Sequence, residues 1–109
     1  MKTNKIIELN DNNFKKNVIE KKCLILVDFW AAWCSPCRIL MPILEDLSKE
    51  YVNKVKIGKV NVEENSYISK KYFIKSIPTL ILFNNGIIKE TKIGSISKSQ
   101  LKSLFNKYI

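Results

Sequence analysis

The chain has 109 residues, of which 46% are hydrophobic and 27% charged, values that fit one folded domain over residues 1–109 and exclude a disordered or fibrous chain. Its 19 basic and 10 acidic residues give a net charge of +9, but the basic residues form no long run and Arg38 is the only arginine. This distribution favours lysines on a solvated surface over a nucleic-acid-binding groove, in which arginine and aromatic residues normally accompany the lysines. We therefore expect no nucleic-acid partner, while a basic surface that meets acidic partners remains an alternative.

The sequence also bears on metals, membranes and location. Three cysteines without histidine cannot supply a disulfide framework or a four-ligand zinc site, so we expect no metal. No segment approaches the roughly 18 apolar residues of a membrane span. The start, MKTNKIIELNDNNF, is polar and lacks the apolar centre of a signal peptide. These features predict a cytoplasmic protein in a reducing compartment, with no membrane partner.

The first third of the chain alternates strand and helix patterns. Residues 6–8 predict a short edge strand, and residues 12–19 predict a helix capped by Asn10 or Asp11. The run LILVDFW, residues 24–30, is almost continuously apolar, as is typical of a strand covered on both faces. Residues 34–51 then have apolar side chains at helical spacing.

The pattern continues to the C-terminus. Pro42 predicts a kink in the helix over residues 34–51. Asn65 is the expected cap of a helix over residues 66–72. The remaining predicted strands are residues 55–62, 79–83 and 87–93. Asn84-Asn85-Gly86 indicates a hairpin turn between the last two strands, and Ser97 with Gln100 matches a capping box that opens the final helix. The order βαβαβαββα predicts an α/β fold with a mixed sheet and helices on both faces.

Two cysteines, Cys34 and Cys37, stand at the junction of a buried strand and a helix. At a helix N-terminus the unpaired N–H groups and the helix dipole favour an anion, so a thiolate at Cys34 would have a lowered pKa. Pro36 suits the first helical turn. This context favours a redox pair over two inert thiols. Cys23 stands alone at the start of a strand, and we interpret it as a buried, unreactive thiol.

Asp28 interrupts the apolar run, so we expect its carboxyl to be buried, with a raised pKa that allows proton exchange near neutrality. Lys59 alternates along its strand with Lys54 and Lys56, which is equally consistent with a solvated face. Trp30 is as consistent with simple packing under the cysteine loop as with a functional contact.

Several separated motifs together resemble the thioredoxin family. They are Val27-Asp28-Phe29-Trp30-Ala31-Ala32-Trp33-Cys34-Ser35-Pro36-Cys37, then Pro42, Lys59, Ser76-Ile77-Pro78-Thr79, Asn85-Gly86 and Gly94. The resemblance implies the thioredoxin fold and an enzyme that exchanges dithiols for disulfides. It implies that Cys34 attacks a client disulfide, that Cys37 resolves the mixed disulfide, and that a thioredoxin reductase using NADPH restores the dithiol. General disulfide reduction by a monomer is the expected function.

The resemblance also implies roles for residues outside the cysteine pair. Asp28 would deprotonate Cys37, with Lys59 near it. Pro78 would follow a cis peptide bond beside the cysteines. The substrate-contact patch would contain Trp33, Ile77 and Gly94, together with the loop residues Ser35 and Pro36.

Ser35 and Ser76 depart from the family pattern, which usually has glycine at both positions. A donor from Ser35 to the Cys34 thiolate would lower its pKa and make the pair more oxidising. A thiol oxidase or isomerase therefore remains an alternative function. A binding subunit in which the redox chemistry is incidental is a separate alternative.

Overall fold

The computed structural model describes residues 6–109. The strands are β1 (Ile7–Leu9), β2 (Leu24–Trp30), β3 (Lys56–Asn61), β4 (Thr79–Asn84) and β5 (Ile87–Ile93). The helices are η1 (Lys15–Ile19), α1 (Ser35–Glu50), α2 (Ser66–Lys71) and α3 (Lys98–Asn106). The predicted order of strands and helices is confirmed, with a π-helix in the first helical position. Residues 1–5 lie outside the described residues. They belong to the polar N-terminal segment, which we expect not to be a signal peptide.

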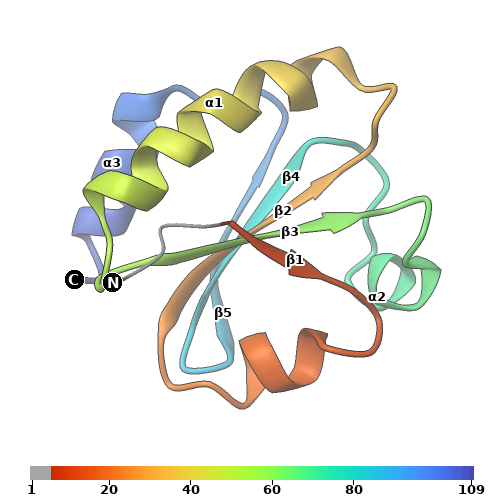
Figure 1. Cartoon of the computed structure of the whole chain (residues 1–109), viewed down its shortest axis with the longest axis horizontal. Coiled ribbons are helices and arrows are strands. Elements are labelled where there is room, and N and C mark those ends of the chain that lie inside the picture. Colours follow the sequence, from red (N-terminus) through yellow and green to blue (C-terminus); the bar gives the residue numbers. More distant parts are fainter. Residues whose placement is uncertain (1–5) are drawn as a thin grey trace.

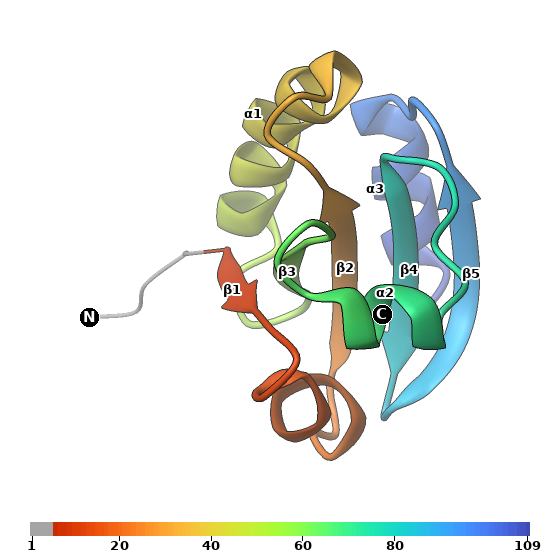
Figure 2. The same ribbon diagram turned by 90° about the vertical axis from the view of Figure 1, so that its right-hand side faces the viewer.

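The strands form one mixed sheet in the order β1-β3-β2-β4-β5. β1, β3 and β2 run parallel, whereas β4 is antiparallel to both β2 and β5. Figures 1 and 2 show α1 and α3 on one face of the sheet and η1 and α2 on the other. The predicted mixed sheet with helices on both faces is therefore confirmed.

Strand β2 lies at the centre of the sheet and packs on both faces, which explains its nearly continuous apolar sequence. Leu24 and Leu26 belong to the core between the sheet and the helices α1 and α3. Ile25, Val27 and Phe29 belong to the opposite core, with side chains of η1 and α2. Because side chains alternate along a strand, Asp28 is on the same face as Leu24 and Leu26.

The N-terminal elements differ from their predicted bounds. Strand β1 covers Ile7–Leu9, one residue later than predicted, because these three residues are the ones that pair with β3. The predicted helix over residues 12–19 is only the short η1. Asn10 supports the preceding turn, since its side-chain oxygen accepts hydrogen bonds from the N–H groups of Asn12 and Asn13, each at 2.8 Å.

The cap of α2 comes from a distant part of the chain, so the prediction for Asn65 is corrected. Asn65 occupies the N-cap position, but its side chain makes no capping hydrogen bond. Its oxygen instead accepts from the N–H of Asp11 at 2.9 Å. The Asp11 carboxylate in turn accepts from the N–H groups of Tyr67 and Ile68, at 3.3 and 2.9 Å. Asp11 therefore caps α2 and not the helix beside it in sequence.

The C-terminal elements follow the prediction closely. β5 has the predicted bounds, and Asn85 and Gly86 both adopt the positive φ angles (53° and 81°) that the turn signal requires. The Ser97–Gln100 capping box is present. β3 is one residue shorter than predicted at each end, and β4 is one residue longer at its C-terminal end. Helix α1 continues through Pro42.

Candidate functional site

Cys34 and Cys37 form a disulfide at the junction of β2 and α1. Cys34 is the N-cap of α1, and its sulfur accepts a hydrogen bond from the N–H of Cys37 at 3.3 Å. Cys34 is 4% exposed and Cys37 only 1%, so Cys34 is the sulfur that is more open to solvent. In the dithiol state the same N–H and the positive end of α1 favour the thiolate of Cys34.

The sheet register brings distant segments to this disulfide. Phe29, near the end of β2, lies opposite Thr79 at the start of β4, and Thr79 lies opposite Ile93 at the end of β5. The residues just beyond these ends, Pro78 and Gly94, are hydrogen-bonded to each other (Gly94 N to Pro78 O, 2.8 Å). The carboxyl end of β2 therefore meets the segments around Pro78 and Gly94 at one edge of the sheet.

Apolar side chains surround the disulfide. Ala31, Trp30, Val62 and Ile77 pack with the two cysteines in one cluster. The Ile77–Pro78 peptide bond is cis, as the resemblance implied. The structure thus packs Ile77 against the cysteines. The strand register places Pro78 and Gly94 at the same edge of the sheet.

Trp33, Ser35 and Pro36 form the exposed side of the site. Trp33 is 64% exposed, and its indole N–H donates a hydrogen bond of 2.8 Å to Glu63 Oε2. Ser35 and Pro36 are exposed in the first turn of α1. A large aromatic side chain held at the surface beside a disulfide offers contact area to an incoming polypeptide.

Asp28 is fully buried, and its two carboxylate oxygens have no hydrogen-bond partner among residues 6–109. Burial raises the pKa of Asp28 from 3.8 to about 7, and the nearby positive charge of Lys59 lowers it by a smaller amount. Asp28 and Lys59 are register partners on β2 and β3. The carboxyl is therefore placed to exchange a proton near neutral pH.

Lys59 and Trp30 flank Asp28. Lys59 is partly buried, and its Nζ lies 5.4 Å from the centre of the Trp30 ring. This position favours the reading of Lys59 as a neighbour of Asp28 over that of a fully solvated residue. The indole nitrogen of Trp30 is also buried without a partner among the described residues. Since side chains alternate along a strand, Asp28 and Trp30 lie on the same face of β2, so this face carries both unpaired polar groups.

Two site residues were missed by sequence reasoning. Arg38 donates from Nη1 to the carbonyl of Ala32 at 2.7 Å and from Nη2 to Ser35 Oγ at 3.2 Å, so it bridges the cysteine loop. The signal for the Arg38–Ser35 contact in the sequence was their spacing of three residues, which makes two side chains neighbours on a helix. Glu63, the partner of Trp33, is 30 residues away from it in sequence, and no local pattern points to that contact.

Cys23 is not part of the disulfide. It is partly exposed, not buried as we predicted, because it precedes β2 and packs only at the margin of the core shared by η1 and α2. Its backbone carbonyl accepts a hydrogen bond from Asn85 at 3.0 Å. Its surroundings are those of a structural thiol.

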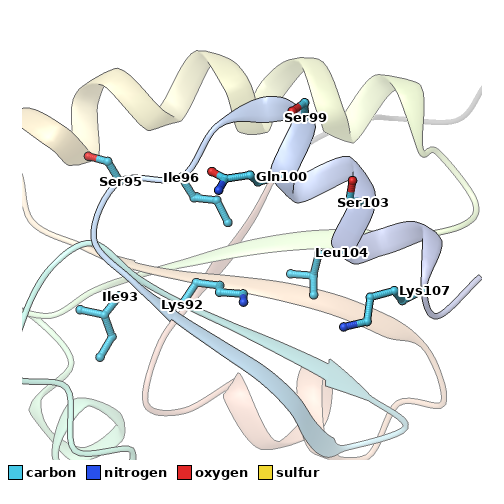
Figure 3. Close-up of a pocket in the computed structure, with 9 residues that line it drawn as sticks. All are labelled: Lys92, Ile93, Ser95, Ile96, Ser99, Gln100, Ser103, Leu104 and Lys107. Carbon is cyan, nitrogen blue, oxygen red and sulfur yellow. The ribbon is translucent and has the colours of Figure 1, made fainter.

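A separate hollow of about 400 Å³ lies between the end of β5 and α3 (Figure 3). Its two lysines, Lys92 and Lys107, each form an ion pair with Glu90, at 3.8 and 2.8 Å between the charged atoms. Because its charges are paired and no cysteine is among the described residues that line it, we assign it no part in the redox chemistry. Among the described residues, no helix is long and apolar enough to cross a bilayer.

Comparison with known proteins finds similarity along nearly the whole chain. The family model described as Thioredoxin matches residues 5–107. A protein named Thioredoxin from Buchnera aphidicola subsp. Acyrthosiphon pisum (strain APS) is 56% identical over 106 residues, or 97% of this chain and 98% of the relative. The Thioredoxin of Buchnera aphidicola subsp. Schizaphis graminum (strain Sg) is 53% identical over the same shares. That of Rickettsia felis (strain ATCC VR-1525 / URRWXCal2) is 50% identical over 93% of this chain and 96% of the relative.

Proposed function

The chain belongs to the thioredoxin family and has its fold and its protein-disulfide oxidoreductase activity, and we propose that Cys34 and Cys37 carry that activity as attacking and resolving residues in the reduction of client proteins. The observation that supports this assignment most directly is the Cys34–Cys37 disulfide at the N-terminus of α1. Cys34 is the N-cap and the more exposed sulfur, which suits a nucleophile. Cys37 lies deeper, which suits a residue that acts only after the client is attached.

The reaction moves two electrons from the protein to the client. The Cys34 thiolate attacks one sulfur of the client disulfide, the client S–S bond breaks, and its second sulfur leaves as a thiolate that takes a proton. The Cys37 thiolate then attacks the Cys34 sulfur and breaks the mixed disulfide. The client departs with two thiols, and the protein is left with the Cys34–Cys37 disulfide, the state in which the structure has it.

Asp28 would supply the proton acceptor for the second step. Its burial raises its pKa to about 7, so the carboxylate form is available near neutrality and can accept the proton that Cys37 must lose. Lys59 would limit the rise in pKa through its positive charge. The surface that receives the client would consist of Trp33, Ser35, Pro36, Ile77, Pro78 and Gly94.

We further propose that residues 1–109 work as one monomeric domain in the cytoplasm. A thioredoxin reductase that draws on NADPH would restore the dithiol, so that NADPH acts indirectly and is not bound by this chain. The family relationship supports disulfide-containing client proteins as partners.

The direction of electron flow is tested by the reduction potential of the Cys34–Cys37 pair, equilibrated against glutathione. A value near about −270 mV, which is characteristic of thioredoxins, is expected for a reductant, whereas about −180 or −120 mV would indicate an isomerase or an oxidant. Ser35 makes this measurement necessary, because a donor from Ser35 to the Cys34 thiolate would make the pair more oxidising. In the structure the Ser35 hydroxyl oxygen accepts a hydrogen bond from Arg38.

The division of roles is tested by substitution of each cysteine. Cys37→Ser is expected to accumulate mixed disulfides between Cys34 and client proteins, because the resolving attack is lost. Cys34→Ser should trap none and should lose activity. The measurement is a non-reducing gel followed by identification of the trapped bands. An absence of trapped clients with Cys37→Ser, or full biological activity of Cys34→Ser, would favour a binding subunit instead.

A further inference from the structure

Phe73 follows α2 and has an unusual backbone conformation. Its φ is 56°, in the left-handed region. The N–H of Phe73 donates to Lys70 O at 3.1 Å, and that of Ile74 donates to Ser69 O at 2.9 Å. These are the two hydrogen bonds of a Schellman motif, and Phe73 occupies the position at which glycine is strongly preferred.

The side chain of Phe73 gives the fold little in return for this conformation. It is 81% exposed, the highest exposed fraction among the large hydrophobic side chains of the described residues. A bulky residue with positive φ is a rare exception, and an exposed ring gains almost no stabilisation from burial. Folding alone would be better served by glycine, so the aromatic ring points to a contact with another molecule.

Two shallow hollows meet at Phe73. The first, of about 490 Å³, lies between the segment after α2 and strand β5, and the second, of about 480 Å³, lies on the side of Val62 and Ser66. Phe73, Ile74 and Lys75 line both hollows, and we call these three residues the Phe73 ridge. Figure 2 shows the segment that leads from α2 back to the start of β4.

Some residues that line the first hollow are direct sequence neighbours of residues at the disulfide site. Its lining includes Ser76, Thr79 and Ile93, which immediately flank Ile77, Pro78 and Gly94. Ile77 packs against the cysteine pair. A client whose disulfide has reached Cys34 would therefore present its neighbouring residues to the Phe73 ridge.

The charge of the surface identifies the kind of segment that fits it. Lys70, Lys71 and Lys75 line the two hollows, and no acidic residue among residues 6–109 does. None of the three lysines forms an ion pair with another described residue. Uncompensated positive charge next to an exposed aromatic ring complements an apolar side chain flanked by carboxylates.

We propose that the Phe73 ridge is a second docking surface for client proteins, separate from the contacts at the disulfide itself. It binds an extended client segment next to the target disulfide, with an apolar side chain on Phe73 and aspartate or glutamate against Lys70, Lys71 and Lys75. The proposal rests on the proposed function, because it requires the client disulfide to be engaged at Cys34.

The test compares three disulfides as substrates of the full chain. They are a disulfide-linked synthetic peptide with leucine flanked by glutamates beside the cysteine, the same peptide with lysines in place of the glutamates, and neutral bis(2-hydroxyethyl) disulfide. Relative to the small disulfide, Phe73→Gly should lower kcat/KM for the acidic peptide about tenfold, the usual size for an aromatic anchor. Lys71→Glu combined with Lys75→Glu should lower it as well and should raise the value for the lysine peptide.

The control variant is Ile87→Ala, which removes a similarly exposed apolar side chain (61%) that lines neither hollow. It should leave the peptide preference unchanged. Phe73→Gly should retain or raise the thermal unfolding midpoint, because glycine suits the left-handed position. Phe73→Tyr should behave as the parent protein does.

The outcomes separate this proposal from the proposed function. If the parent protein reduces none of the three disulfides, the proposed function fails. If it reduces them and Phe73→Gly leaves the peptide preference unchanged, the docking surface is refuted. A dimer in sedimentation velocity that Phe73→Gly dissociates, without a change in peptide preference, would also refute it and would assign the ridge to self-association.

Discussion

At the scale of single residues, Asp28 connects the proposed chemistry with stability. The carboxyl is buried without hydrogen-bond partners among the described residues, and burial raises its pKa from 3.8 to about 7. At pH values below the pKa of the unfolded chain, the group is protonated in both states. As the pH rises towards 7, the unfolded chain releases this proton first, so folding becomes progressively less favourable. Stability associated with a neutral Asp28 is therefore lost as the pH rises through about 7.

Asp28→Asn should remove this dependence. The variant should match the parent protein near pH 4 and exceed its free energy of unfolding above pH 7.5 by about 4 kcal/mol at most, at about 1.4 kcal/mol for each unit of pKa. Urea unfolding at several pH values measures the difference. The turnover of Asp28→Asn with a protein disulfide should fall near neutral pH, since Cys37 loses its proton acceptor. Equal stability curves for the two proteins would refute the burial argument, and unchanged kinetics would remove Asp28 from the mechanism.

Arg38 is the second residue with a consequence that can be measured. Its guanidinium joins Ala32 O and Ser35 Oγ, which places a positive charge beside the loop of Cys34. Arg38→Ala should raise the pKa of the Cys34 thiol and make the reduction potential more negative by about 10 to 30 mV, because a less stable thiolate makes the dithiol a stronger reductant. Thiol titration and glutathione equilibration measure the two changes.

Arg38→Lys is the matched variant for this measurement. Lysine keeps the positive charge but loses the forked geometry that reaches two acceptors. If charge dominates, Arg38→Lys will behave as the parent protein does. If the bridge dominates, it will resemble Arg38→Ala. Identical potentials for all three proteins would show that Arg38 acts on neither the thiolate nor the loop.

At the scale of elements, the start of α2 depends on a residue far away in sequence. The Asp11 carboxylate accepts hydrogen bonds from the N–H groups of Tyr67 and Ile68. The backbone N–H of Asp11 in turn donates a hydrogen bond to the side-chain oxygen of Asn65. This reciprocal arrangement connects the segment before η1 to the start of α2. It therefore fixes α2 at one end, and the Phe73 ridge lies at the other end of the same helix.

Asp11→Ala should lower the free energy of unfolding by about 1 to 2 kcal/mol, the usual cost of a lost helix cap. Asn12→Ala is the control, because the recorded hydrogen bond of Asn12 uses its backbone N–H and not its side chain. Chemical denaturation of the two variants gives the comparison. Equal stability of Asp11→Ala and the parent protein would show that solvent caps α2 equally well.

At the scale of the whole molecule, strand order assembles the site. β2 is parallel to β3 but antiparallel to β4, so the end of β2 meets the start of β4. β5 then returns its own end to the same edge, with Thr79 opposite Ile93. The disulfide, the cis Ile77–Pro78 bond and Gly94 come together for this reason, although more than fifty residues separate the first from the last. The lining of the first hollow extends this edge to the Phe73 ridge.

Local sequence determined the features that depend on local physics. The apolar run of β2, the Asn85-Gly86 turn, the Ser97–Gln100 box and the cysteine pair at a helix start are each specified within a few residues, and each is present. The burial of Asp28 was also predictable, because a carboxyl within a strand covered on both faces has nowhere else to lie. Family resemblance, and not local pattern, predicted the cis bond before Pro78.

Only the tertiary structure decided the features that join distant segments. Asp11 caps α2 because the two segments pack together, whereas their sequences are individually consistent with local caps. Lys59 is placed beside Asp28 by strand register, Glu63 meets Trp33 across 30 residues, and Arg38 turns back onto its own loop. The exposed, left-handed Phe73 had no signal in the sequence, because an apolar residue near a helix end normally predicts burial. Sequence periodicity specifies which side chains can be buried, but pairing and packing decide which groups finally meet.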